Sequence, residues 1–203
     1  MELQNGVTVH LRGGCVEELR DMWYMFAPLG VGVEFIDGYL GWRDASAYLY
    51  DLVDANEGFV VNCDTDCFVY DWAIARELVG YMMRNGYSHC GVRDDAGTIP
   101  HRTNSRDVMN PFFGIFNTSI LRDLPDVLRV TDGYEPFNGF YEYINRNYRP
   151  LYLGARQCLD GVSTELLFRG RSFCVHSWYG REFEEHRERI RAVHSYALTK
   201  KIV

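Results

Sequence analysis

The sequence lacks the segments that mark membrane, secreted and repetitive proteins. No apolar run approaches the ~18 residues that a membrane-spanning helix needs. The first residues do not show the charged and apolar regions of a secretory signal. No internal repeat or low-complexity segment interrupts the 203 residues. We therefore expect one domain without an integral membrane segment, either complete or excised from a larger multidomain protein.

A recognisable cysteine pattern is also absent. The six cysteines are scattered, and their spacing fits neither a disulfide framework nor a C-x-x-C zinc pair. Thiols that pack as small core residues are typical of a reducing compartment, which predicts a cytoplasmic location. The cysteines stand at positions 15, 63, 67, 90, 158 and 174.

Clustered positive charge is missing as well. The net charge is −7, whereas phosphate backbones are bound by clusters of lysine and arginine, so nucleic acid is not an expected partner. The one basic segment, residues 181–201, mixes its arginines with glutamates and predicts an ion-paired, solvated helix. The remaining composition, 47% apolar and 24% charged residues, is that of a globular protein with a sizeable core.

The first 63 residues predict alternating strands and helices. Residues 7–11, 31–36 and 59–63 are rich in β-branched and apolar residues, whereas residues 15–27 and 45–53 have helical apolar spacing. The order β-α-β-α-β implies a parallel sheet with right-handed crossovers. The carboxyl ends of its strands share one edge, where open α/β sheets bind ligands.

The rest of the chain continues the mixed pattern. A helix is expected over residues 72–85, ending at Asn85-Gly86, followed by a long polar loop over residues 93–107. Such a loop is typical of a functional flap or a mobile surface segment. Further strands are expected at residues 112–116, 151–153 and 173–176, and further helices at residues 119–128, 139–147 and 181–199.

Two carboxylates follow the apolar strand at residues 59–63. Asp64 and Asp66 form a D-x-D triplet around Thr65, and residues i and i+2 at a strand end project to the same side. Both carboxylates can therefore face one cation, and hard oxygen ligands suit Mg²⁺ or Mn²⁺. The alternative is an ordinary acidic surface turn.

With these motifs in place, the chain resembles a GT-A fold glycosyltransferase, the D-x-D-containing class that uses nucleotide-sugar donors. The resemblance implies a Rossmann-like α/β fold with a mostly parallel central sheet flanked by helices and a smaller C-terminal acceptor-side portion. Residues 1–66 would form the nucleotide-binding half and residues 67–203 the acceptor-binding half. The segment before the D-x-D is short for the class, so the donor pocket is either trimmed or rebuilt. The later motifs that carry the resemblance are Asn110-Pro111-Phe112-Phe113, Phe116-Asn117, Tyr134-Glu135-Pro136-Phe137, Asp160-Gly161 and His176-Ser177-Trp178-Tyr179.

The resemblance also implies a donor site. Asp64, Asp66 and His176 would hold Mn²⁺ or Mg²⁺, although a histidine at a strand end is also a common structural residue. Asp37 would accept a hydrogen bond from a uracil N–H, or else it only forms a turn with Gly38. The remaining donor-site residues fall into two groups. Toward the base and ribose we expect Leu11, Arg12 and Gly13, with Asp64 and Thr65 beside them. Toward the diphosphate we expect Arg93, His101 and Arg102, which are alternatively solvated loop residues.

An inverting transfer needs a carboxylate that removes the proton from the acceptor hydroxyl. Asp160 is the first candidate by resemblance and Glu135 the second, while Asp-Gly also favours tight turns without catalysis. A retaining reaction would need neither residue as base.

The function expected from the resemblance is metal-dependent transfer of a hexose or deoxyhexose. The donor would be a nucleoside-diphosphate sugar, with a UDP-sugar favoured, and the acceptor a hydroxyl of a glycan or glycoconjugate. One alternative is a haloacid-dehalogenase-like phosphatase with Asp64 as nucleophile and Asp66 as acid/base. That class expects a lysine-bearing helix, whereas the late lysines here are Lys200 and Lys201. The other alternative is a non-catalytic sugar-binding module.

Overall fold

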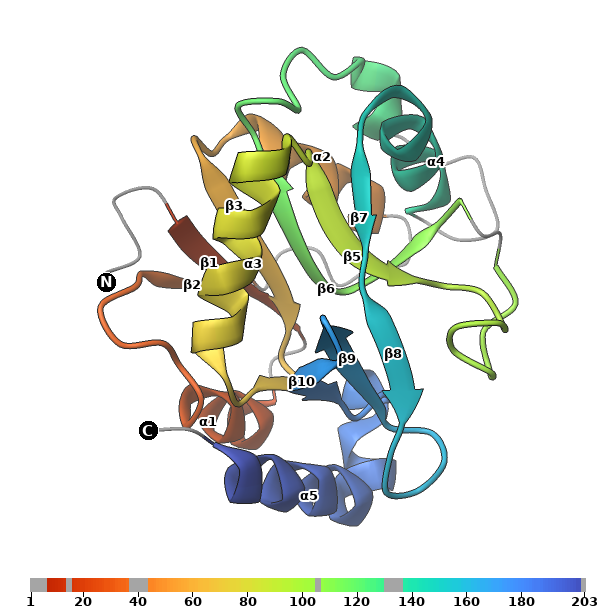
Figure 1. The fold of residues 1–203 in the computed structure, drawn as a ribbon. Coiled ribbons are helices and arrows are strands. Elements are labelled where there is room, and N and C mark those ends of the chain that lie inside the picture. Colours follow the sequence, from red (N-terminus) through yellow and green to blue (C-terminus); the bar gives the residue numbers. More distant parts are fainter. Residues whose placement is uncertain (1–6, 14–15, 37–43, 105–106, 130–136, 202–203) are drawn as a thin grey trace.

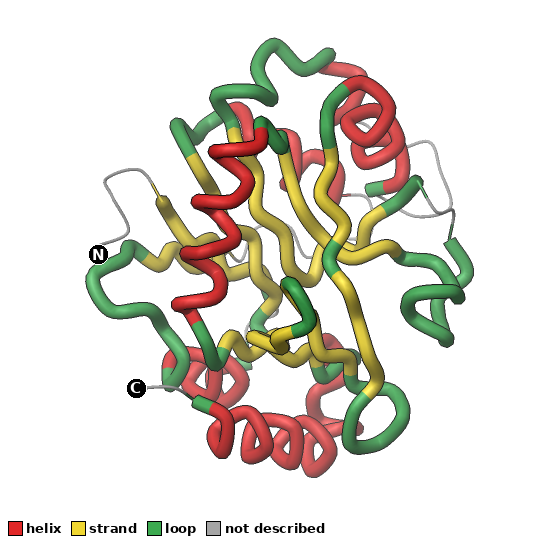
Figure 2. The backbone as a smooth tube through the Cα atoms, in the orientation of Figure 1, coloured by secondary structure: helices red, strands yellow, loops and turns green. Residues whose placement is uncertain are grey.

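The computed structural model describes residues 7–13, 16–36, 44–104, 107–129 and 137–201. Within them the chain builds a larger and a smaller β-sheet with helices packed around both (Figure 1, Figure 2). In this described part, no helix combines the length and apolarity needed to cross a membrane.

Five strands of the larger sheet run in one direction. β1 is parallel to both of its neighbours, β2 and β3, and β5 is parallel to β7. β6 is antiparallel to β3 and β5 and joins the two parallel groups. The expected mostly parallel sheet is therefore confirmed. In spatial order the strands are β2 (Val33–Ile36), β1 (Val7–Arg12), β3 (Phe59–Asp64), β6 (Met109–Asn117), β5 (His89–Arg93) and β7 (Pro150–Tyr152).

The smaller sheet is antiparallel, and the chain enters it directly from the larger one. β3 continues through Thr65 and Asp66 into β4, and β7 continues through Leu153 into β8 (Figure 1). The D-x-D triplet thus lies where the two sheets meet. In spatial order the strands are β4 (Cys67–Val69), β10 (Arg171–His176), β9 (Thr164–Phe168) and β8 (Gly154–Gln157).

Helices cover both faces of the larger sheet. Successive β3 residues point to opposite faces, so Val61 packs with apolar residues of α1, α3 and α5, whereas Val60 packs with those of α2 and α4. The helices are α1 (Glu17–Tyr24), α2 (Asp44–Asp54), α3 (Trp72–Asn85), α4 (Asn138–Asn147) and α5 (Phe183–Lys200), with short 3₁₀ helices η1 (Asp126–Arg129) and η2 (Gly180–Glu182).

The helix after the D-x-D has the ends that its sequence predicts. The Asp71 side chain accepts the N–H groups of Ala73 and Ile74 at 3.0 and 3.2 Å, which caps the first turn of α3. Gly86 takes a left-handed conformation (φ 66°) and ends the helix as predicted.

The helix expected over residues 119–128 is wrong. The Asn117 side chain accepts the N–H of Ser119 at 3.2 Å and starts a turn instead. Asp123 is left-handed (φ 54°), which breaks a helix, and Pro125 follows it. Only η1 forms in this region.

The sequence did not predict strands β4, β5, β8 and β9. The residues of β8, Gly-Ala-Arg-Gln, are poor strand formers, and the strand forms at a sheet edge by pairing with β9. In β5, Gly91 interrupts the apolar run that would have indicated a strand. Glycine suits this position because a Cβ there would lie 3.0 Å from the Met109 sulfur of β6. Tertiary pairing determines these strands, so local composition does not predict them.

Candidate metal centre

The D-x-D turn packs directly on the end of β1. Arg12 pairs with Asp64 in the sheet register, and the Thr65 N–H donates to the Arg12 carbonyl at 2.9 Å. A Cβ at Gly13 would overlap the side chain of Thr65, so only glycine fits beside this buried threonine. Leu11, expected near the base and ribose, places its side chain in the core.

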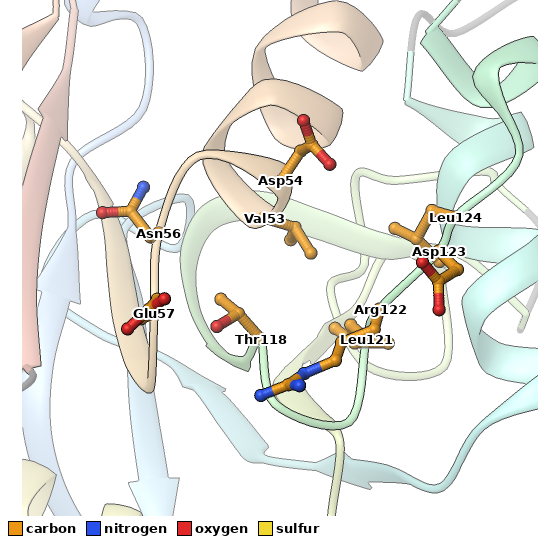
Figure 3. Close-up of a pocket in the computed structure, with 9 residues that line it drawn as sticks. All are labelled: Val53, Asp54, Asn56, Glu57, Thr118, Leu121, Arg122, Asp123 and Leu124. Atoms are coloured by element: carbon orange, nitrogen blue, oxygen red, sulfur yellow. The ribbon is translucent and has the colours of Figure 1, made fainter.

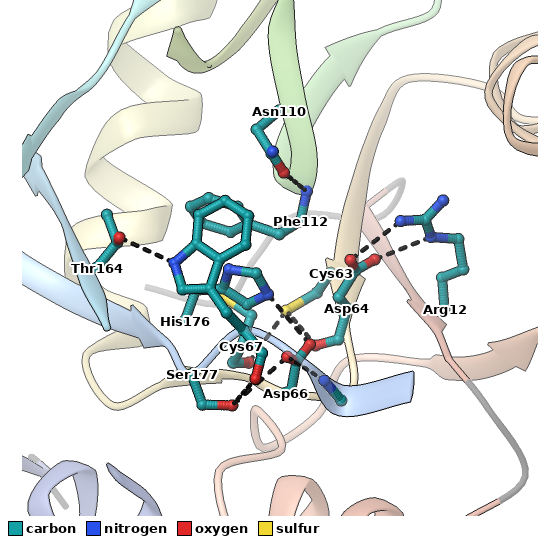
Figure 4. Close-up of polar contacts among 12 residues, drawn as sticks. Arg12, Cys63, Asp64, Asp66, Cys67, Asn110, Phe112, Thr164, His176 and Ser177 are labelled. Atoms are coloured by element: carbon teal, nitrogen blue, oxygen red, sulfur yellow. Dashed lines mark hydrogen bonds and ion pairs between the residues drawn. The ribbon is translucent and has the colours of Figure 1, made fainter. Parts of the chain in front are cut away.

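Asp66 is buried and is held by the chain that follows β10. Its Oδ1 lies 3.2 Å from the Nε2 of His176, and its Oδ2 accepts the N–H of Gly180 at 3.1 Å and the hydroxyl of Ser177 at 3.4 Å (Figure 4). The backbone carbonyl of Asp66 accepts the Ser177 N–H at 2.9 Å. A Cβ at Gly180 would lie 2.8 Å from the Asp66 Cγ, so glycine is required for this approach.

The surroundings keep Asp66 ionised. Burial alone raises the pKa of this carboxyl, but the neighbouring His176 and the Gly180 N–H lower it further, and the net result is a pKa below the ordinary value. An ionised, buried carboxylate beside an imidazole is a suitable ligand pair for a divalent cation.

Asp64 has a different partner. Both of its carboxylate oxygens accept from Arg12, with Nε–Oδ1 at 2.9 Å and Nη2–Oδ2 at 3.0 Å (Figure 4). Such a bidentate ion pair fixes the orientation of the carboxylate. Each oxygen still has a second lone pair, so the ion pair with Arg12 does not prevent Asp64 from acting as a metal ligand.

The three side chains expected to hold a metal lie together. One ligand atom each from Asp64, Asp66 and His176 lies within 4.8 Å of the other two. Two carboxylates and an imidazole fit Mn²⁺ or Mg²⁺, the metals expected from the sequence. In addition, the Nδ1 of His176 is buried without a hydrogen-bond partner. The residues present therefore fit a divalent cation.

Aromatic rings surround His176. Its ring stacks on Phe112 at 4.1 Å between centroids with 14° between the planes, and Trp178 lies 4.4 Å away. The Trp178 indole N–H donates to the Thr164 hydroxyl at 3.0 Å. Trp178 and Tyr179 both take left-handed backbone conformations, at φ 62° and 61°. Two consecutive non-glycine residues of this kind are strained, and they shape the turn that brings Gly180 to Asp66.

The basic residues expected near a diphosphate have partners of their own. Arg102 forms a bidentate ion pair with buried Asp94, with N–O distances of 2.6 and 2.7 Å. Its guanidinium carbon lies 5.7 Å from the centroid of the Trp178 ring. His101 lies edge-on to the same ring, at 4.6 Å between centroids. Arg93 instead packs over Tyr152 at 4.0 Å. Arg102 and His101 are thus connected to the His176 cluster through Trp178.

Asp160 lies in the turn between β8 and β9. Its carboxylate accepts the N–H groups of Val162 and Ser163 at 3.0 and 2.7 Å, and it pairs with Arg189. Burial alone raises the pKa of Asp160, but these hydrogen bonds and Arg189 bring it below the ordinary value. The turn role considered from the sequence is therefore present, and the base role stays a prediction. Asp37 and Glu135 lie outside the described residues.

Sequence reasoning missed Ser177 and Gly180 as partners of Asp66, and Asp94 as the partner of Arg102. The His-Ser-Trp-Tyr-Gly run after a strand was a usable signal for the first two, since glycine and serine permit close approach.

A hollow of about 260 Å³ lies elsewhere, beside the start of β3 and the end of β6, and its lining includes Glu57, Thr118 and Arg122 (Figure 3). It therefore lies at the opposite end of β3 from the D-x-D turn.

No protein-family model and no curated protein matches the sequence. The structure is similar to a glycosyltransferase involved in the glycosylation of the major capsid of PBCV-1, with a TM-score of 0.54 and 11% identity over 90% of this chain and 98% of that one. A weaker likeness, with a TM-score of 0.46 and 8% identity over 94% and 97%, is to a 4-diphosphocytidyl-2C-methyl-D-erythritol synthase from Anaerococcus prevotii. The first comparison shows a Rossmann-like glycosyltransferase fold.

Proposed function

We propose that this chain is a metal-dependent glycosyltransferase. It would transfer a hexose or deoxyhexose from a nucleoside-diphosphate sugar, with UDP as the preferred nucleotide, to a hydroxyl of a glycan or glycoconjugate. The observation that carries the proposal is the gathering of Asp64, Asp66 and His176 at the end of β3, within a fold similar to a glycosyltransferase. We propose a cytoplasmic location on the basis of the scattered spacing of the cysteines in the sequence.

Each residue of the centre has a role in the proposal. Asp64, Asp66 and His176 would hold Mn²⁺ or Mg²⁺, which when bound stabilises negative charge on the departing nucleoside diphosphate. Gly180 and Ser177 orient Asp66 through the hydrogen bonds described above. Leu11 and Gly13 would approach the base and ribose through their backbone, together with Thr65.

The rest of the donor site and the acceptor base are also proposals. Asp37 would select uracil by accepting its N3–H, and Arg102 with His101 would face the diphosphate from the Trp178 side. Arg93 would contribute positive charge from the end of β5. Asp160, or else Glu135, would take the proton of the acceptor hydroxyl in an inverting reaction.

The environment of Asp64 disfavours the phosphatase alternative. Both oxygens of Asp64 accept hydrogen bonds from the Arg12 guanidinium, which withdraws negative charge from them and makes the carboxylate a weaker nucleophile. That class also expects a lysine, but the lysines of this chain are Lys200 and Lys201, and Lys200 pairs with buried Glu165 in the smaller sheet. The contacts of Asp64 with Arg12 instead suit a carboxylate that stays in place and binds a cation.

Donor hydrolysis with and without Mn²⁺ tests the proposal. Glycosyltransferases release nucleotide slowly when water replaces the acceptor, so we expect Mn²⁺-dependent release of UDP from a panel of UDP-sugars. Cleavage of p-nitrophenyl phosphate instead would establish a phosphatase. Binding of a sugar with neither activity would leave the sugar-binding module.

A further inference from the structure

We propose that Arg12 is an internal counter-cation that couples metal binding to anion binding at this centre. In this view Arg12 weakens the binding of a divalent cation alone and strengthens the binding of a diphosphate once the cation is present. The inference rests on the proposed function, because it assigns a regulating residue to the same metal centre.

The first support is the geometry of the ion pair between Arg12 and Asp64. The guanidinium donates to both oxygens of Asp64, and the exposed fraction is only 8% for the Arg12 side chain and 19% for that of Asp64. Salt and water therefore screen the pair poorly. A guanidinium does not lose its proton in proteins, so its positive charge stays beside Asp64 at every working pH. A cation that approaches Asp64 must overcome this repulsion.

The second support is an unused donor on the same guanidinium. Nε and Nη2 bind Asp64, but Nη1 is buried and has no hydrogen-bond partner. A buried donor without a partner is costly, and an incoming anionic oxygen would satisfy it. The hydroxyl of Tyr141, which lies close enough to Arg12 and Asp64 to interact with both electrostatically, is likewise buried and unpartnered. Two unsatisfied polar groups from β1 and α4 thus accompany the D-x-D turn.

The third support is the charge balance. Asp64, Asp66 and Arg12 carry a net single negative charge when His176 is neutral. A divalent cation changes this to a net single positive charge, which suits an anion of high charge density. Arg102, another guanidinium near the centre, forms its ion pair with Asp94 and is therefore not counted in this balance. A diphosphate is therefore the class of ligand that Arg12 would recognise.

Two binding measurements on purified protein test this coupling. Mn²⁺ binding is followed by electron paramagnetic resonance of the free ion, and inorganic pyrophosphate binding by calorimetry at saturating Mn²⁺. We expect Arg12→Gln to bind Mn²⁺ alone about tenfold more tightly and pyrophosphate about tenfold more weakly than the wild type. Arg122→Gln, which removes an arginine at the opposite end of β3, should change neither affinity. Circular dichroism verifies that each variant is folded.

The opposite directions of the two effects make the test decisive. If Arg12→Gln binds Mn²⁺ as the wild type does or more weakly, Arg12 only orients Asp64 and the inference is overturned. If Arg12→Gln does not fold, Arg12→Lys carries the test, because lysine keeps the charge and lacks Nη1. Its Mn²⁺ affinity should stay within about threefold while pyrophosphate binding weakens about tenfold; unchanged pyrophosphate binding overturns the inference. A wild type that binds no divalent cation would instead refute the metal centre itself.

Discussion

Replacing Asp66 by asparagine separates the charge of the metal centre from its shape. Asp66 is 5% exposed, so truncation to alanine would leave the partners His176 and Gly180 without an acceptor in the interior. The amide of asparagine can still accept the Gly180 N–H and can donate to the imidazole. We therefore expect Asp66→Asn to fold, with a loss of about 1–3 kcal/mol from the weakened charge-assisted hydrogen bonds.

The expected effect on metal binding is larger and can be worked out. A ligand that binds only the folded state stabilises it by about 2.7 kcal/mol at one hundred times its dissociation constant. For a chain of 203 residues, 1 kcal/mol moves the melting temperature by about 2–4 °C, so Mn²⁺ should raise it by about 5–10 °C. If the variant binds Mn²⁺ about a hundredfold more weakly, only about 0.4 kcal/mol and roughly 1 °C remain.

The assay is thermal unfolding followed by circular dichroism at increasing Mn²⁺, each protein being compared with its own metal-free sample. Asp54→Asn serves as the matched control, since Asp54 ends α2 beside the hollow at the other end of β3. It should keep the full Mn²⁺ shift. A folded Asp66→Asn protein that also keeps the full shift would refute the assignment of Asp66 as a metal ligand.

The sequence was a good guide where a local pattern matched the final packing. The alternation of the first strands and helices gave the parallel part of the sheet, and Asp71 and Gly86 mark the ends of α3 as capping chemistry predicts. The gathering of Asp64 and Asp66 follows from strand geometry alone. His176, far along the chain, could be added only through the resemblance to glycosyltransferases, because spacing does not indicate that β10 pairs with β4.

The rest depended on contacts that local sequence does not encode. Arg12 and Asp64 form a bidentate ion pair because β1 and β3 are neighbours in register. The sequence alone does not single out Asp64, because it contains many other acidic residues that could pair with an arginine. Likewise, the sequence assigned Arg102 either to a diphosphate or to a solvated loop, and it did not indicate the pairing with buried Asp94. Ion pairs of this kind depend on how the folded chain packs, so local sequence does not indicate the partner of either arginine.

Three further predictions address base selection, the acceptor base and acid stability. UDP should bind more tightly than CDP with Mn²⁺ present, because cytosine has no N3–H for Asp37; equal affinities, or an unchanged preference in Asp37→Ala, would reduce Asp37 to a turn residue. Asp160→Asn should reduce transfer by about 10²–10⁴-fold and, through its weakened hydrogen bonds to Ser163, also lower the melting temperature; transfer at the wild-type rate would leave Asp160 a turn residue only. Glu165 is fully buried; burial alone raises its pKa, but hydrogen bonds from Lys200, an arginine and two tyrosines lower the pKa to about 2, against an ordinary value of 4.5. Because the folded-state pKa is the lower one, this carboxylate stabilises the protein above about pH 5, and the contribution is lost as the pH falls toward 2. Glu165→Gln should therefore reduce the free energy of unfolding by about 3–5 kcal/mol in urea at pH 7 and by clearly less at pH 3. An equal loss at both pH values would show that the charge of Glu165 does not hold α5 against the smaller sheet.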